Sequence, residues 1–208
     1  MRIVFFLYEG LTTLDVIGPH DVLSRLPGVE AVSVSTHGGP VTADTGVLGL
    51  TATHAMADVE SCDVLVVPGG MAGTFAAAAD PEILAWIRSV TANATWITSV
   101  CTGSLILGAA GLLEGRKATT HWAAIDLLAG YGAEPTRDRV VFDGNVVTGA
   151  GVSAGIDLAL TLAARIAGDD IARIIQLGIE YDPDPPFDCG SPAKASPELI
   201  ERAGSLFG

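Results

Sequence analysis

Residues 95–104 read TWITSVCTGS and contain the boundary between a strand pattern and a helix pattern. A β-branched apolar run ends at Val100, and a segment with helical spacing follows at once from Thr102 to Ala110. We expect a buried strand over 95–100 that turns directly into a helix over 102–110, with Cys101 at the turn. Two buried elements explain the uncharged run over 89–113 better than a membrane span does.

The rest of the chain alternates short apolar runs with longer helical patterns. We expect strands over 3–8, 29–35 and 63–67, hairpins over 40–53 and around Asp143-Gly144, and helices over 11–26, 80–90, 122–129, 153–166, 169–179 and from Pro197 onward. The first helix is expected to break near Gly18-Pro19, and Asp80 is expected to cap the second. Continuous apolar strands separated by helices indicate an α/β protein with a mostly parallel sheet covered on both faces. No linker or internal repeat divides the chain, so we expect one domain over 1–208.

The charge balance excludes several classes of function. The chain has 24 acidic and 11 basic residues, a net charge of −13. Because phosphate binding requires clustered Lys and Arg, no nucleic-acid partner is expected. With 49% hydrophobic residues, the chain is not a disordered acidic segment. We expect a partner subunit to cover part of this apolar surplus.

Three cysteines, Cys62, Cys101 and Cys189, lie far apart in the sequence. Their odd number rules out a complete disulfide framework, and no Cys/His cluster indicates a zinc site. A reduced, cytoplasmic thiol protein with no membrane partner is therefore the expectation.

Cys101 occupies the position of a nucleophile elbow. At such a turn only small neighbours avoid collision, and Thr102, Gly103 and Ser104 are small. The free N–H groups at the start of the following helix are expected to lower the pKa of the thiol and to make the thiolate available. The alternative is an inert structural cysteine in the core.

Other residues could complete such a site, because ligands gather at the carboxyl ends of parallel strands. Asp15 lies in an apolar setting just past the first strand, where burial would raise its pKa and suit it to proton exchange with a substrate. It could instead cap a helix. Gly69-Gly70 could present N–H groups as an oxyanion hole or could form an ordinary tight turn. His121 could act as a base for Cys101 or could cap a helix.

Motifs over about the first 190 residues resemble the ThiJ/PfpI superfamily. They are Leu14-Asp15-Val16-Ile17-Gly18-Pro19, Val67-Pro68-Gly69-Gly70, Ser99-Val100-Cys101-Thr102-Gly103-Ser104, Ala118-Thr119-Thr120-His121-Trp122 and Gly151-Val152-Ser153-Ala154-Gly155. The loop over 180–187 and Gly190-Ser191-Pro192 are similar to those of members that hydrate isocyanides. The resemblance implies a flavodoxin-like α/β sandwich and a homodimer.

The same resemblance implies a reaction and the residues that carry it. Cys101 is the implied nucleophile, Asp15 the general acid and base, and Thr102 a support through its hydroxyl or its N–H group. Around the substrate lie Gly69, Gly70, His121 and Trp122. The implied reaction converts a small apolar isocyanide into an N-substituted formamide through a thioimidate on Cys101, with no metal or organic cofactor. Many relatives carry Glu where this chain has Asp15, and Asp is similar to the isocyanide-hydrating members.

Three other functions stay open. AraC-type activators carry a similar sensor domain, but they need a helix-turn-helix domain for which these 208 residues leave no room. A redox sensor or a 2-oxoaldehyde-detoxifying enzyme would use the same cysteine, and the latter would favour Glu at position 15 and a His partner. The run over 149–155 departs from Gly-x-Gly-x-x-Gly in its last spacing, so a dinucleotide is not expected.

Overall fold

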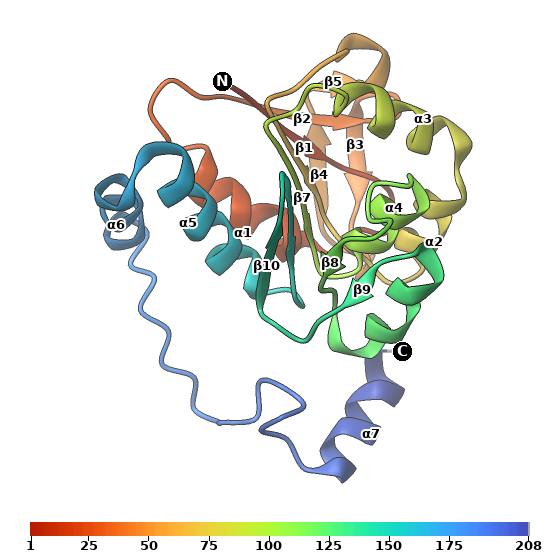
Figure 1. Ribbon diagram of the computed structural model, residues 1–208, viewed down its shortest axis with the longest axis vertical. Helices are drawn as coiled ribbons and strands as arrows, with labels where there is room; N and C mark the ends of the chain where they lie inside the picture. The colour runs from red at the N-terminus through yellow and green to blue at the C-terminus, as the bar shows by residue number, and fades with distance from the viewer. Residues whose placement is uncertain (208) are drawn as a thin grey trace.

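Seven strands form one sheet in the computed structural model, which describes residues 1–207 (Figure 1). Across the sheet they run in the order β10 (Val140–Asp143), β11 (Val146–Gly149), β7 (Trp96–Val100), β6 (Val64–Val67), β1 (Arg2–Phe6), β2 (Glu30–Ser35) and β5 (His54–Ala55). All neighbouring pairs are parallel except β10 with β11. The expected α/β class with a mostly parallel sheet is confirmed.

Helices cover both faces of this sheet. One face carries α1 (Thr13–Leu23), α5 (Ala154–Ala167) and α6 (Asp169–Gly178), and the other carries α2 (Ala72–Ala79), α3 (Pro81–Val90), α4 (Gly103–Ala109) and the 3-10 helix η2 (Trp122–Tyr131) (Figure 1). Both faces of the central strands are therefore shielded from solvent, and every residue of β6 is fully buried. This burial explains why the strand reads as an uninterrupted apolar run rather than as an alternating pattern.

The remaining elements are small. They are the antiparallel pair β3 (Gly39–Thr42) and β4 (Gly49–Ala52), the parallel pair β8 (Lys117–Ala118) and β9 (Glu134–Pro135), the turn η1 (Met56–Asp58) and the last helix α7 (Pro197–Phe207). The β3–β4 hairpin is confirmed, and so is the hairpin that joins β10 to β11. Gly144 adopts a positive φ of 61° at the second hairpin turn, a conformation that glycine allows without strain.

Local signals placed the start of α3 correctly. The Asp80 carboxylate accepts hydrogen bonds from the N–H groups of Glu82 and Ile83, at 2.8 and 3.4 Å, and Pro81 occupies the first helical position. A side-chain cap of this kind satisfies donors that the helix leaves unpaired. The cap is therefore confirmed.

One helix prediction was wrong in detail. Helix α1 continues through Pro19 instead of breaking there. Proline removes one backbone hydrogen bond, but α1 packs closely on α5, and an added Cβ at Gly18 would lie 3.0 Å from Cγ1 of Ile156. This tertiary packing outweighs the local preference. The helix expected over 122–129 is present as the 3-10 helix η2, and α2 was not foreseen.

The uncharged run over 89–113 divides into β7 and α4 with short connections, as expected. Residues 1–207 contain no helix with the length and apolarity needed to cross a bilayer.

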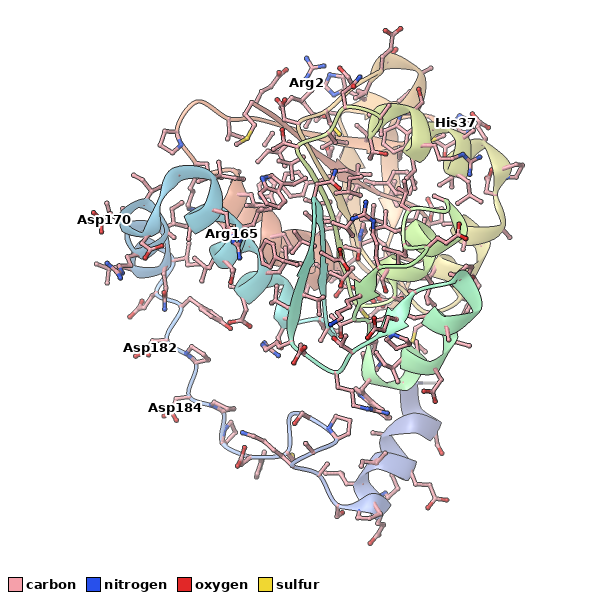
Figure 2. All side chains as sticks on the ribbon, viewed as in Figure 1. Arg2, His37, Arg165, Asp170, Asp182 and Asp184 are labelled. Atoms are coloured by element: carbon pink, nitrogen blue, oxygen red, sulfur yellow. The ribbon has the colours of Figure 1, made fainter. Side chains whose placement is uncertain are left out.

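The ring of Phe142 fastens the edge strand β10 to its neighbours through one cation–π contact and one ring–ring contact. The guanidinium of Arg165, which lies on α5 (Figure 2), sits 4.4 Å from the centre of the Phe142 ring. Trp96 of β7 approaches the same ring edge-on, with 5.9 Å between ring centres. A cation over an aromatic face stabilises such a contact.

After α6 the chain runs as an extended segment, residues 179–196, that leaves the sheet and leads to α7 (Figure 1). Asp182 and Asp184 point outward from this segment (Figure 2), and Phe187 is 75% exposed. We call residues 179–207 the C-terminal arm.

Helix α4 is so close to β6 that only glycine fits at its first position. A Cβ at Gly103 would lie 2.3 Å from the carbonyl oxygen of Val67, which belongs to rigid backbone. We expect Gly103→Ala to lower the free energy of unfolding by about 2 kcal/mol or more, measured by urea unfolding followed by circular dichroism. Gly130→Ala is the matched control, since a Cβ at Gly130 meets nothing within 4 Å. Equal losses in the two variants would contradict this account.

Candidate active site

Three chain segments meet at the carboxyl edge of the sheet. Val67 of β6 lies opposite Ser99 of β7, so Gly69 and Cys101, each two residues farther on, leave the sheet at the same level. The turn after β1 lies against them, because a Cβ at Gly70 would stand 2.3 Å from the carbonyl oxygen of Gly10. The expected convergence of three strand ends is confirmed.

Cys101 sits at a tight turn between β7 and α4. Its φ of +56° is unusual for a residue other than glycine, and the residue is 6% exposed. Its N–H group donates to the carbonyl oxygens of Gly149 and Ala150, at 3.1 and 2.9 Å, and its own carbonyl oxygen accepts from the Thr120 hydroxyl at 2.9 Å. These contacts hold a backbone conformation that costs of order 1 kcal/mol or more.

Asp15 lies within α1 and is completely buried. Its Oδ2 accepts a hydrogen bond of 2.9 Å from the N–H group of Gly69, while its Oδ1 has no nitrogen or oxygen partner among the described residues. Burial raises the pKa of Asp15 from 3.8 to about 7, although the Gly69 N–H group and the Cys101 thiol oppose the rise. The expected rise in pKa is confirmed, and the carboxyl can gain or lose a proton near neutral pH.

The expectation of a lowered thiol pKa was wrong. Burial, followed by the negative charge of Asp15, raises the pKa of Cys101 to about 12. The N–H groups of Val152 and Thr102 favour the thiolate, but α4 is only seven residues long, and their effect is smaller than the cost of burial. The thiol therefore keeps its proton at neutral pH unless a neighbouring group accepts it, and Asp15 is that neighbour.

Gly69 and Gly70 serve the site differently from an open oxyanion hole. The Gly69 N–H group is bonded to Asp15, and the Gly70 N–H group donates to the Thr102 hydroxyl at 3.1 Å, so neither donor is free. Glycine is required for another reason, since a Cβ at Gly69 would lie 2.6 Å from the backbone nitrogen of Thr102. The two glycines let the loops touch and hold Asp15 and Thr102 in place.

The Thr102 hydroxyl joins the turn after β7 to Gly70 and to Thr74 of α2. Besides accepting from Gly70, it donates to the Gly70 carbonyl oxygen at 3.0 Å and lies 2.8 Å from the Thr74 hydroxyl. The Tyr8 hydroxyl continues the chain of contacts, 3.0 Å from Thr74 and 2.9 Å from the carbonyl oxygen of Pro68. Tyr8 and Thr74 are distant from Cys101 in sequence, and no local pattern indicated their part in the site.

His121 and Trp122 lie in the wall of a cavity of about 460 Å³ near Cys101. Nδ1 of His121 accepts a hydrogen bond of 3.4 Å from the N–H group of Ala123, so this residue caps η2. Burial lowers the pKa of His121, and within residues 1–207 the ring makes no hydrogen bond to Cys101. The structure therefore shows His121 as the cap of η2 in the wall of this cavity, without a hydrogen bond to the thiol.

Two residues beside Cys101 escaped the sequence analysis as individual site members. Thr120 binds the carbonyl oxygen of Cys101, and the N–H group of Val152 lies near its sulfur. Val152 has a φ of +35°, a strained value for a β-branched residue, and it lies in the turn before α5. Over the described residues, no group of three or more His, Cys, Asp or Glu side chains could hold a metal ion.

Comparisons with known proteins show the family and the fold that the chain shares. The model of the DJ-1/PfpI family matches residues 1–165. The chain is 50% identical over 203 residues to "Isonitrile hydratase" of Pseudomonas putida, which covers 98% of this chain and 88% of that protein. A ThiJ/PfpI family protein from Pseudomonas syringae superposes with a TM-score of 0.95 at 46% identity, over 99% of this chain and 85% of that one.

The chain is also similar to a regulator. It is 35% identical to the "HTH-type transcriptional regulator CdhR" of Pseudomonas aeruginosa over 141 residues, which make up 67% of this chain and 41% of that protein. The similarity extends over less than half of the regulator.

Replacing Asp15 with Asn tests the cost of burying the carboxyl. The fold raises the pKa of Asp15 from 3.8 to about 7 and so favours the protonated acid. Stability from this group is complete below pH 3.8 and is lost as pH rises through about 7, by about 4 kcal/mol in total. We expect Asp15→Asn and the wild type to have the same free energy of unfolding near pH 4. Between pH 4 and 8 the wild type should lose stability relative to the variant, as measured by urea unfolding at a series of pH values.

Asp182→Asn, on the exposed C-terminal arm, controls for the loss of one negative charge. A stability difference between Asp15→Asn and the wild type that does not change with pH would contradict the raised pKa.

Proposed function

The chain belongs to the DJ-1/PfpI family, and from this premise we propose that it hydrates isocyanides to N-substituted formamides, as a single ThiJ/PfpI-like domain over 1–208. The observation that carries the proposal is the burial of the Asp15 carboxyl beside the turn that carries the buried Cys101, since a Cβ at Gly69 would meet both Asp15 and Thr102, in a chain half identical to an isonitrile hydratase. The reaction requires a nucleophile and one group that both accepts and returns protons. Cys101 and Asp15 have these two properties.

In the first step, ionised Asp15 accepts the proton of the Cys101 thiol while the sulfur attacks the terminal carbon of the isocyanide, R–N≡C. The same proton then passes from Asp15 to that carbon. The product is a thioimidate, R–N=CH–S–Cys101, and Asp15 is again ionised. A carboxyl with a pKa of about 7 suits both halves of this exchange, because it binds and releases a proton with similar ease near neutral pH.

In the second step, Asp15 accepts a proton from a water molecule that attacks the thioimidate carbon. The proton moves to the substrate nitrogen, and the intermediate becomes R–NH–CH(OH)–S–Cys101. Loss of the remaining hydroxyl proton to the leaving sulfur, through Asp15, breaks the C–S bond. The products are R–NH–CHO and the starting thiol. Atoms and charges balance with water as the only co-reactant.

The surroundings of the pair suit an uncharged reacting group. The Cys101 side chain is buried, and the apolar side chains of Trp122 and Ile125 line the adjoining cavity with His121. The terminal carbon of an isocyanide is neutral and electrophilic, so it can enter such surroundings without the cost of burying a charge. Thr102, Gly69 and Gly70 act in this proposal by holding Cys101 and Asp15 in place.

The alternative functions make different demands on the same pocket. A 2-oxoaldehyde-converting enzyme would favour Glu at position 15 and a His partner for Cys101, and His121 makes no hydrogen bond to that residue. A sensor would need no turnover, and the similarity to a regulator covers only 41% of that protein. Formamide and lactate formation, measured with a panel of isocyanides and with methylglyoxal, separates the three functions.

We also propose that two copies of the chain form the active protein. Large apolar side chains are exposed on the helical face made by α1, α5 and α6. They are Leu14 (42% exposed), Ile17 (38%), Ile174 (65%) and Leu177 (82%). A second copy that covers this face would remove them from water.

Substitution of the reacting pair tests the reaction. With p-nitrophenyl isocyanide, we expect Cys101→Ala to abolish formamide formation and Asp15→Asn to lower kcat by about 100-fold or more, since the thiol then has no base. Both variants are expected to stay folded, as judged by circular dichroism.

Cys189→Ser is the matched control, because Cys189 is exposed on the C-terminal arm and should retain wild-type turnover when replaced. Wild-type hydration by a folded Cys101→Ala variant would overturn the proposed mechanism.

Light scattering coupled to size-exclusion chromatography tests the assembly. We expect a mass of about 43 kDa, twice the chain mass of 21.3 kDa, and a shift toward the single-chain mass in Leu177→Glu. Phe75→Glu is the control, since Phe75 is also exposed but lies on α2, across the sheet. A wild-type mass near that of one chain would rule out the dimer.

A further inference from the structure

The cavity beside Cys101 has a positive outer wall, although the chain carries a net charge of −13. Arg137 and Arg139 line it, and none of its lining residues is Asp or Glu. The chain has 24 acidic residues and 11 basic ones, yet the wall of this cavity contains two arginines and no carboxylate. Such a wall attracts an anionic group of a ligand.

One of the two arginines is already neutralised. The Arg139 guanidinium lies 2.6 Å from the Asp157 carboxylate and also donates to the Ser153 hydroxyl at 3.2 Å. Close to the same wall, the Asp188 carboxylate is paired with Lys194 at 2.5 Å. Asp157 of α5 and Asp188 of the C-terminal arm are therefore both paired.

Arg137 is different. Its side chain is exposed at the cavity mouth, and within the described part of the chain it forms no ion pair. Asp138, its neighbour in sequence, is not among the residues that line the cavity. The mouth thus holds one uncompensated positive charge, together with Arg139, whose charge is balanced.

The cavity adjoins Cys101, because Val152, whose N–H group lies near the Cys101 sulfur, is one of its lining residues. Thr120 and Ala150 line it, and both form hydrogen bonds with the backbone of Cys101. Its opposite wall is the segment Gly190–Ala193 of the C-terminal arm. A substrate whose terminal carbon meets the sulfur would therefore direct its R group along this cavity, between His121 and the arm, toward Arg137.

We propose that the R group of the substrate ends in a carboxylate and that Arg137 binds it at the cavity mouth. This inference rests on the proposed isocyanide hydration and adds the substrate class. The isocyano end is neutral and suits the buried pair, whereas the far end carries one negative charge. A guanidinium binds a carboxylate through two parallel N–H···O bonds, and a single uncompensated arginine matches a single charge better than a doubly charged phosphate.

Pairs of acids and esters test this substrate class. Isocyanoacetate and 6-isocyanohexanoate, each beside its ethyl ester, vary the charge at two spacer lengths. We expect the wild type to show a kcat/KM at least tenfold higher for the carboxylate than for the ester at one of these lengths. The preference should decrease between 50 and 500 mM NaCl, because the arginine is exposed and its charge is screened.

Variants of Arg137 assign the preference to a residue. In Arg137→Gln we expect the acid-to-ester ratio of kcat/KM to fall about tenfold or more, mainly through KM for the acid, and in Arg137→Lys to recover in part. Arg88→Gln removes an exposed arginine from α3, outside the cavity, and should leave the ratio at the wild-type value.

The outcomes separate the two proposals. Hydration of the esters by the wild type, with no preference for the acid at either length or with a ratio unchanged in Arg137→Gln, would overturn the carboxylate inference and leave isocyanide hydration standing. Absence of hydration for acids and esters alike would overturn the proposed function itself.

Discussion

The burial of the Asp15 carboxyl against the Cys101 thiol is the interaction on which the site depends. Burial holds the pKa of one group near 7 and that of the other near 12, so the pair keeps a proton that can move between carboxyl, sulfur and substrate. A solvated carboxylate would be a weaker base, and it would take the proton of the thiol less readily. The stability lost by burying Asp15 is therefore linked to the chemistry that the pair can perform.

Close backbone contact makes this burial possible. The turns after β6 and β7 lie so near each other that a Cβ at Gly69 or Gly103 would overlap neighbouring backbone. Asp15 of α1 is completely buried beside these turns and accepts the Gly69 N–H group, and the Thr102 hydroxyl joins the two turns by accepting from Gly70. The glycines are thus required for shape and for holding side chains, while the donors that would have made an oxyanion hole are already used.

The cavity adds specificity to a pair that is itself generic. In the proposed reaction Cys101 and Asp15 act on a small neutral group, whereas Arg137 and the segment Gly190–Ala193 line the cavity that we propose for the remainder of the substrate. Because that segment belongs to the C-terminal arm, the arm contributes to the site although it leaves the sheet (Figure 1). The same arrangement places a positive charge at the mouth of a pocket in a strongly acidic chain.

The α/β class, the two hairpins, the cap of α3 and the place of Cys101 at a strand end could be predicted from the sequence, because they depend on periodicity and on residues close in the chain. The apolar neighbours of Asp15 also indicated this residue. The fold was needed to see that α1 runs through Pro19, that the Cys101 thiol keeps its proton, that Gly69 and Gly70 have no free donor, and that Thr74 and Arg137 belong to the surroundings of the site. Each of these depends on burial or on contact between segments far apart in the chain, and local sequence carries no measure of either.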